Sequence, residues 1–230
     1  YVKILFFEVD AEDFSADSTE TVDCYFQFHM LRVILNFAGQ VYMMKAMNKI
    51  DIDDPELIQR VLAVLRAGGV VMHPTETCYG LAVDIMDENA VEKLYQVKRM
   101  SRDKPVSILV DAMGMAGEYG LFNEIAEKLT FDYWPGPLSI LVPRKRRLPA
   151  FLNPEEDFVS IRCSSLEFCE DMVAALGHPV TTTSANISGE PQLYDAVALE
   201  GVDLLVDGGA LPQSRPSTIV RVIDDRLEVL

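Results

Sequence analysis

Four polar clusters contain most of the side chains that could take part in chemistry. In chain order they span His73–Leu81, Lys98–Pro105, Thr181–Gly189 and Arg215–Val220. They supply hydroxyls, amides and cations, with few candidate general bases. Such groups bind phosphate oxygens and neutralise the charge that develops as pyrophosphate leaves. The residues therefore suit nucleotidyl transfer, in which positioning and charge stabilisation do most of the work.

The other polar residues do not form a familiar catalytic or metal-binding motif. There is no Walker lysine loop and no G-x-G-x-x-G fingerprint, and the three histidines give no persuasive Ser/His/Asp order. The cysteines lack C-x-x-C spacing, so the sequence predicts no metal site and indicates reduced thiols in a cytoplasmic protein. They are Cys24, Cys78, Cys163 and Cys169.

The composition narrows the class of partner. A formal net charge of −16 argues against a nucleic-acid groove as the main surface, because phosphate neutralisation needs clustered cations. A local anion pocket is still compatible with this charge, since binding one ATP needs only a few donors. No run reaches the roughly 18 consecutive apolar residues of a membrane helix. We therefore expect no membrane association and at most a weak RNA contact.

The elements that must position these clusters follow from apolar spacing and capping residues. Helices are predicted to begin at Asp53–Asp54, Asp87, Asn123 and Ser165, and the last to end at Gly177. Apolar, β-branched runs predict strands over residues 70–72, 106–110, 138–142, 158–162, 180–183, 203–206 and 218–222. Helices and strands alternate, which predicts an α/β layered domain with some antiparallel pairing where strands follow one another directly.

Two segments depart from this pattern. Residues 1–46 combine alternating apolar residues, an acidic Ser/Thr-rich stretch and a final apolar run. We interpret them as an N-terminal extension, either disordered or an artefact of translation, with an added hairpin or dimerisation arm as the alternative. The domain then spans residues 47–230. The basic run at 144–147 is interpreted as a solvated loop.

Six motifs in register connect the chain to a known family. They are Pro-Thr-Glu-Thr-x-Tyr-Gly-Leu from Pro74, a lysine-rich loop that ends in Lys104-Pro105, Trp-Pro-Gly-Pro-Leu from Trp134, Val-Ser-Ile-Arg ending at Arg162, Ser-Ala-Asn-x-Ser-Gly from Ser184, and Pro-Ser-Thr-Ile-Val from Pro216. In order and spacing, from about Ile50 to Val222, the chain resembles the YrdC/TsaC-type threonylcarbamoyl-AMP synthases.

The resemblance implies a fold and a reaction. The fold is a single YrdC-like α/β domain, an open twisted mixed sheet flanked by helices, with a concave ligand pocket. The implied enzyme is a nucleotidyltransferase that uses L-threonine, bicarbonate and ATP to give threonylcarbamoyl-AMP and pyrophosphate. Mg²⁺ would accompany ATP, and no tightly bound cofactor is expected. The product would pass to a tRNA threonylcarbamoyl transferase complex that makes threonylcarbamoyladenosine.

The resemblance also assigns residues to the site. Lys98 and Lys104 are expected to be catalytic, through charge stabilisation. The positions implied to contact L-threonine are Thr77, Tyr79, Arg162, Thr182 and Ser217. The positions implied to contact ATP are Lys98, Arg99, Arg102, Lys104, Ser184 and Asn186.

One departure from the family motif leaves alternatives open. Met100 stands where the family's basic loop has arginine. The second hypothesis is therefore a binding module of the same fold, which recognises RNA or a nucleotide without making the adenylate. A third is a sugar-phosphate enzyme on the related dihydroxybutanone-phosphate synthase fold, although the acidic magnesium-binding loop it needs is not seen. Glu76 is interpreted as an exposed turn carboxylate rather than a general base.

Overall fold

The computed structural model describes residues 21–26, 29–35, 41–45, 48–197, 199–224 and 226–230, and divides the chain into two compact units, Tyr1–Ala46 and Met47–Leu230. In the first unit, β1 (Thr21–Phe26), β2 (His29–Leu35) and β3 (Val41–Lys45) form an antiparallel sheet. Residues 1–20 lie outside the described residues. The interpretation of residues 1–46 as a disordered or artefactual extension stays a prediction.

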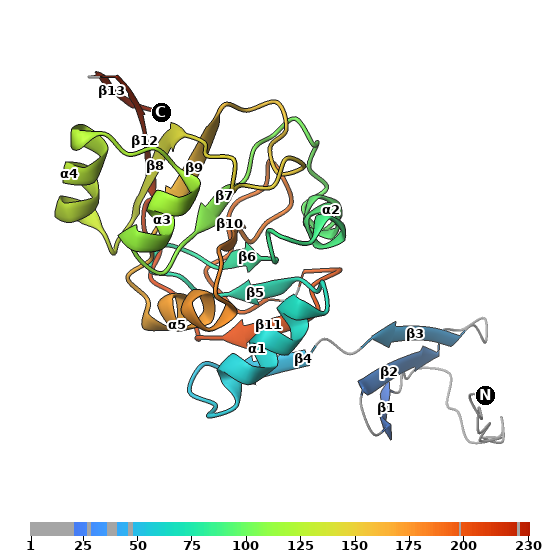
Figure 1. The fold of residues 1–230 in the computed structure, drawn as a ribbon. Helices are drawn as coiled ribbons and strands as arrows, with labels where there is room; N and C mark the ends of the chain where they lie inside the picture. Colours follow the sequence, from blue (N-terminus) through green and yellow to red (C-terminus); the bar gives the residue numbers. More distant parts are fainter. Residues whose placement is uncertain (1–20, 27–28, 36–40, 46–47, 198, 225) are drawn as a thin grey trace, which may run out of the picture. The chain divides into compact units, whose positions relative to one another are not determined.

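The second unit is built on one mixed sheet of ten strands in the order β13-β12-β8-β9-β7-β10-β6-β5-β11-β4 (Figure 1). Parallel and antiparallel neighbours are both present, as predicted. The strands are β4 (Asn48–Asp51), β5 (Val71–His73), β6 (Gly80–Ala82), β7 (Ser107–Leu109), β8 (Leu138–Pro143), β9 (Phe158–Arg162), β10 (Val180–Ser184), β11 (Leu204–Asp207), β12 (Thr218–Ile223) and β13 (Arg226–Val229).

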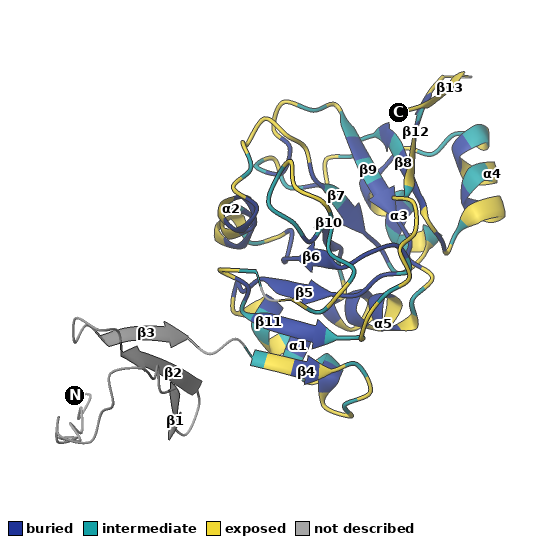
Figure 2. Ribbon diagram, turned by 180° about the vertical axis from the view of Figure 1, so that it is seen from behind, coloured by how far each residue is buried: buried dark blue, intermediate teal, exposed yellow. Residues whose placement is uncertain are grey.

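Helices cover both faces of this sheet. They are α1 (Leu57–Arg66), α2 (Glu88–Val97), α3 (Met113–Tyr119), α4 (Glu124–Tyr133) and α5 (Glu167–Leu176). Successive strand residues point to opposite faces, so Val71 packs in a core with α1 and α5, whereas Met72 packs in a second core with α2, α3 and α4. The central strands are buried between these two layers (Figure 2). The predicted α/β fold is confirmed.

Two of the predicted helix starts are confirmed. The Asp87 side chain accepts hydrogen bonds from the first backbone amides of α2, and Asn123 does the same for α4. The starts at Asp53–Asp54 and Ser165 are wrong. Asp54 instead accepts from the amide of Glu56 in a turn before α1, and α5 begins after Leu166.

The basic run at 144–147 is solvated at Arg146 and Arg147, which are exposed, but not at Arg144 and Lys145, which are partly buried. The Arg144 guanidinium donates to backbone carbonyls of the irregular segment that follows it. These acceptors belong to Leu148, Pro149, Leu152, Asn153 and Glu156, at 2.8–3.5 Å. Lys145 donates to the carbonyl of Gly117, and Arg147 pairs with Glu118 at 3.0 Å. Arg144 and Lys145 therefore bind backbone carbonyls, and Arg147 binds a carboxylate, whereas the sequence suggested that they contact solvent.

None of the helices in the described part of the chain combines the length and the apolar character that crossing a membrane requires.

Candidate functional site

A cavity of ≈ 290 Å³ opens where several strands of the large sheet end. Its walls come from the turn between β5 and β6, from the start of β7, from β8, β9 and β10, and from the segment before β12. Four of the predicted threonine contacts line it: Thr77, Arg162, Thr182 and Ser217. Of the predicted ATP contacts, Ser184 lines it. Residues separated by up to 140 positions therefore meet at one site.

The turn between β5 and β6 orients Thr77. The Thr75 hydroxyl donates to the carbonyl of Cys78 at 2.7 Å and accepts from the amides of Thr77 and Cys78, each at 3.2 Å. Thr75 therefore folds the turn on itself. The Ser214 hydroxyl donates to the carbonyl of Thr77 at 2.9 Å and ties the turn to the segment before β12. Thr77 is consequently held on both sides.

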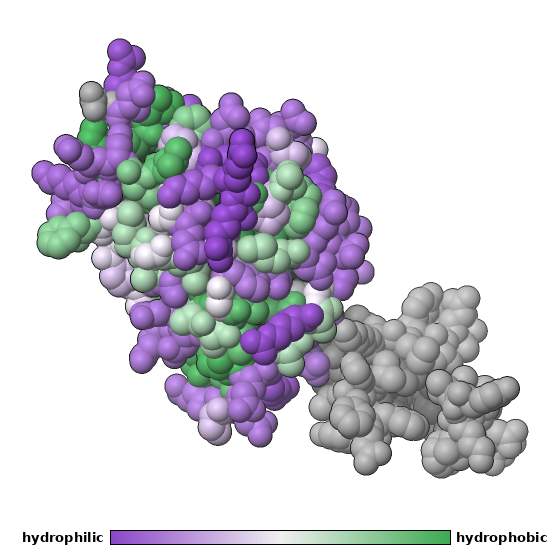
Figure 3. Space-filling view, viewed as in Figure 1, coloured by the Kyte–Doolittle hydropathy of each residue, from purple (hydrophilic) through white to green (hydrophobic). Residues whose placement is uncertain are grey.

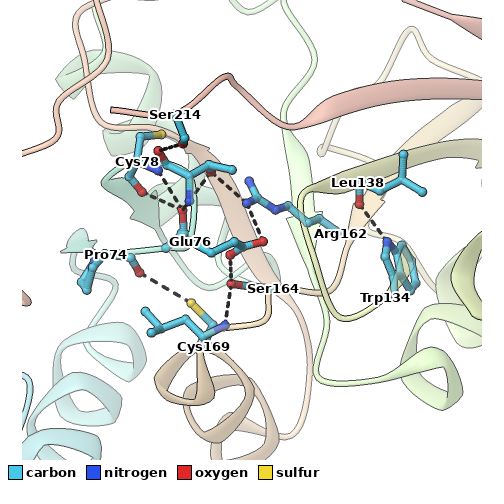
Figure 4. A network of polar contacts seen from close by, with 12 residues as sticks. Pro74, Glu76, Cys78, Trp134, Leu138, Arg162, Ser164, Cys169 and Ser214 are labelled. Carbon is cyan, nitrogen blue, oxygen red and sulfur yellow. Dashed lines mark hydrogen bonds and ion pairs between the residues drawn. The ribbon is translucent and has the colours of Figure 1, made fainter. Parts of the chain in front are cut away.

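Arg162 is the cation of this cavity, and Figure 4 shows it pointing toward Glu76. It is buried at the end of β9. Its Nη2 donates to Thr77 Oγ1 at 2.9 Å and lies 2.9 Å from Glu76 Oε1, an ion pair without good hydrogen-bond geometry. Arg162 Nε is also buried and has no hydrogen-bond partner among the described residues. The guanidinium therefore lines the cavity, with Nε buried behind its surface.

Glu76 is half-buried, whereas the sequence suggested an exposed carboxylate, and it forms an ion pair with Arg162. The Ser164 hydroxyl donates to Glu76 Oε2. Burial raises the pKa of Glu76, but the charge of Arg162 and the hydrogen bond from Ser164 outweigh burial and hold the pKa below its ordinary value. The carboxylate is therefore ionised at neutral pH and a weak base. This supports the interpretation that Glu76 is not a general base.

Lys98 follows α2 and holds the turn after β10. Its Nζ donates to the carbonyl of Ser184 at 2.5 Å, to the carbonyl of Asn186 at 3.2 Å and to Asn186 Oδ1 at 3.0 Å. Ser184 Oγ also donates to Asn186 Oδ1, at 2.7 Å. Because an ammonium has three donors, these contacts use all of them. Burial lowers the pKa of Lys98 to about 8.

The two arginines predicted to contact ATP are paired with carboxylates outside the cavity. Arg99 Nη2 lies 3.5 Å from Glu200 Oε2, and both side chains are exposed. Arg102 Nε donates to Glu92 Oε2 at 2.8 Å, and its guanidinium lies over the ring of Tyr95. In this structure neither arginine lines the cavity.

Lys104 and Met100 complete the basic loop. Lys104 Nζ donates to Ser188 Oγ at 3.2 Å, and its chain neighbours Pro105 and Val106 line the cavity. Lys104 itself does not line the cavity but directly precedes two residues that do. Met100 is partly buried against the core, so its side chain fills space rather than facing a ligand.

Tyr79 lies behind the cavity wall. Its side chain is fully buried, and its hydroxyl donates to the carbonyl of Gly209 at 2.8 Å and accepts from the amide of Gly208 at 3.0 Å. Its neighbours Cys78 and Gly80 line the cavity, whereas Tyr79 does not. The structure thus gives Tyr79 a supporting position.

Two further polar residues that sequence reasoning did not select line the cavity: Ser107 and Ser139. Ser107 Oγ donates to Ser160 Oγ at 2.8 Å across β7 and β9. Ser139 directly follows the Trp-Pro-Gly-Pro-Leu motif, and this position beside a family motif could have indicated that it lies in the site. Within the described residues, no group of three His, Cys, Asp or Glu side chains is placed to hold a metal ion.

Comparison with known proteins gives one family match. The family model named Sua5/YciO/YrdC, described as "Telomere recombination", matches residues 63–230. A threonylcarbamoyl-AMP synthase from Xanthomonas oryzae is 33% identical over 166 residues, which cover 68% of this chain and 89% of that protein.

Solved structures agree in fold. Pyrococcus abyssi Sua5 complexed with L-threonine superposes with a TM-score of 0.74 at 26% identity, covering 81% of this chain and 57% of that chain. This chain thus spans little more than half of that protein. MTH1692 from Methanobacterium thermoautotrophicum superposes with a TM-score of 0.64 at 33% identity, covering 80% and 91%.

Proposed function

The chain belongs to the Sua5/YciO/YrdC family, and from this premise we propose that it is a threonylcarbamoyl-AMP synthase. The single observation that carries the proposal is the convergence of Thr77, Arg162, Thr182 and Ser217 on one cavity. A guanidinium in the cavity wall, surrounded by hydroxyls, suits an amino acid that carries both a carboxylate and a hydroxyl. L-threonine is such a molecule.

In this proposal the threonine carboxylate binds Arg162. The hydroxyls of the cavity exchange hydrogen bonds with the hydroxyl of the threonine side chain. Valine would leave those hydroxyls unpaired, which penalises it. The threonine amine reacts with bicarbonate to give a carbamate and water. A carbamate oxygen then forms a bond to the α-phosphorus of ATP, and the bond from that phosphorus to the bridging oxygen of pyrophosphate breaks.

In this proposal the basic loop and the turn after β10 bind the phosphates and the nucleotide of ATP. Lys104 directly precedes two residues of the cavity wall and would neutralise charge on the leaving pyrophosphate. Lys98 would act mainly by holding Ser184 and Asn186 in place for the nucleotide. Mg²⁺ would arrive with ATP, as it commonly does when phosphates supply most of its ligands.

We also propose that the product serves tRNA modification through a partner transferase, because a mixed anhydride hydrolyses unless an acceptor consumes it. A cytosolic location fits the three free, buried cysteines Cys78, Cys163 and Cys169.

The test is pyrophosphate release by the purified chain, measured with each of threonine, bicarbonate and ATP omitted in turn. A synthase releases pyrophosphate only when all three are present, and serine or valine should support less release. If nucleotide binds but no threonine-dependent pyrophosphate appears, the chain is the binding module that Met100 suggests, and the synthase proposal is wrong.

A further inference from the structure

The last strand of the large sheet has one open edge. β13 pairs with β12, and no described strand pairs with its other side. The amide of Leu230 donates to the carbonyl of Ile219 at 2.9 Å. Backbone groups in an antiparallel strand alternate between its two sides, so Arg226 and Glu228 also direct theirs toward β12. Leu227 and Val229 therefore direct their N–H and C=O groups outward.

Exposed apolar side chains gather at this edge. Half of the ten exposed large hydrophobic residues among the described residues of the second unit belong to this hairpin and its last residue: Ile219, Ile223, Leu227, Val229 and Leu230. Figure 3 shows hydrophobic side chains at this end of the sheet, and Figure 2 shows β13 exposed. Such a concentration marks an interaction surface.

These side chains lie on both faces of the hairpin. Leu227 pairs with Val222, and Val229 pairs with Val220. Because Val220 and Val222 are buried in the core, Leu227 and Val229 lie on the face of the hairpin that carries the core side chains. Ile223 pairs with Arg226 on the opposite face. A partner docked on one face would leave the other apolar set in water. A strand added at the edge contacts both.

The charged side chains of β13 indicate which strand would pair with its open edge. We propose that β13 of a second copy of this chain pairs antiparallel with β13, with Leu227 opposite Leu227 of the other copy. This register places Arg226 opposite Glu228 of the other copy, and Glu228 opposite its Arg226. Both Leu227 residues direct their backbone groups outward, so they exchange two hydrogen bonds across the symmetry axis.

Neighbouring registers that keep each face aligned are unfavourable. A shift one way places Glu228 opposite Glu228, and a shift the other way places Arg226 opposite Arg226; like charges directly opposite are destabilising. Within one chain, Arg221 lies 3.6 Å from Glu228. The proposed pairing therefore continues an alternation of positive and negative side chains across three strands.

The experiment is sedimentation equilibrium of the full chain at rising micromolar concentration, with charge-reversed variants. Wild type should approach the mass of two chains. Arg226→Glu alone places glutamate opposite glutamate twice, and Glu228→Lys alone places cations opposite each other twice, so each should sediment as one chain. An equimolar mixture of the two variants restores opposite charges at both positions and should sediment as two chains.

The matched control is Arg66→Glu, the same charge change on an exposed residue of α1, which packs on β5 and β11 toward the other edge of the sheet and should leave the dimer intact. Thermal unfolding checks that each variant is folded, and recovery by mixing excludes a folding defect as the cause. The proposal is overturned if wild type remains monomeric, if Arg226→Glu still dimerises, or if mixing restores nothing. Pyrophosphate release by Arg226→Glu should match wild type, so this result is separate from that of the synthase proposal.

Discussion

At the scale of single residues, Arg162 has more donors than its protein neighbours use. Thr77 and Glu76 both meet Nη2, whereas Nε is buried without a partner. Nε has almost no accessible surface, so a ligand in the cavity would have to contact the other nitrogens of the guanidinium. Glu76 limits the guanidinium to one orientation, and Ser164 fixes Glu76 in turn. The binding side chain is therefore set before any substrate arrives.

Arg162→Ala should raise the KM for threonine strongly and leave the KM for ATP nearly unchanged. A charge-assisted contact contributes roughly 1.5–3 kcal/mol, which corresponds to an increase on the order of ten- to a hundredfold. Steady-state pyrophosphate release against each substrate measures this. Arg162→Lys is the matched control, since it keeps a charge beside Glu76 and should be less impaired. A rise in the ATP KM instead would assign Arg162 to the nucleotide.

Lys98 gives stability a dependence on pH with a definite sign. Its pKa is about 8 in the folded chain, lowered by burial from 10.5. Between these values the unfolded chain binds more protons than the folded chain, so the free energy of unfolding should rise with pH through this window. Below pH 8 this contribution is absent. Urea denaturation of wild type and Lys98→Met across pH 8 to 10.5 isolates it; a difference that falls with pH contradicts it.

At the scale of elements, features set by residues close in sequence could be predicted, whereas features set by contacts with distant segments could not. Asp87 and Asn123 cap helices through their own side chains, so their sequence positions sufficed. β6 consists of Gly80-Leu81-Ala82, which has little intrinsic strand preference, and pairing with β5 and β10 decides its conformation. Arg144 was misread because its acceptors are backbone carbonyls, which no sequence pattern displays.

The basic loop offers a test at this scale. Lys104→Ala should slow adenylate formation by on the order of a hundredfold, the usual effect of losing one charge-stabilising group. Arg99→Ala should cost less, because Glu200 already pairs with that guanidinium. Arg102→Ala is a matched control, since Glu92 and the Tyr95 ring occupy Arg102. Single-turnover kinetics measure all three. Loss of turnover in Arg102→Ala, with Lys104→Ala active, would place the phosphate contact at Arg102.

At the scale of the whole molecule, the family motifs located the cavity but not its full wall. Thr77, Arg162 and Ser217 lie within motifs, Thr182 lies just before one, and all four line one cavity. Ser107 reaches the cavity only because β7 lies beside β10, which is far from it in sequence, and spacing along the chain does not show this pairing. The boundary of the two compact units lies between Ala46 and Met47.

A chain that begins at Met47 should therefore fold and act alone. Because the large sheet and both of its cores lie within residues 47–230, removing residues 1–46 should leave the melting temperature and pyrophosphate release nearly unchanged. Differential scanning calorimetry of both chains measures the first quantity. A loss of several degrees would mean that the first unit stabilises the second.

The guanidinium of Arg144 has a consequence for how the segment at 145–157 opens. One side chain binds five of its carbonyls, so no single peptide group can leave without weakening the others. Segments joined in this way open as cooperative units rather than residue by residue. The amide protons of this irregular segment should consequently exchange with solvent deuterium at a shared rate, and a protease should cut it only after Arg144 has released all of its acceptors together.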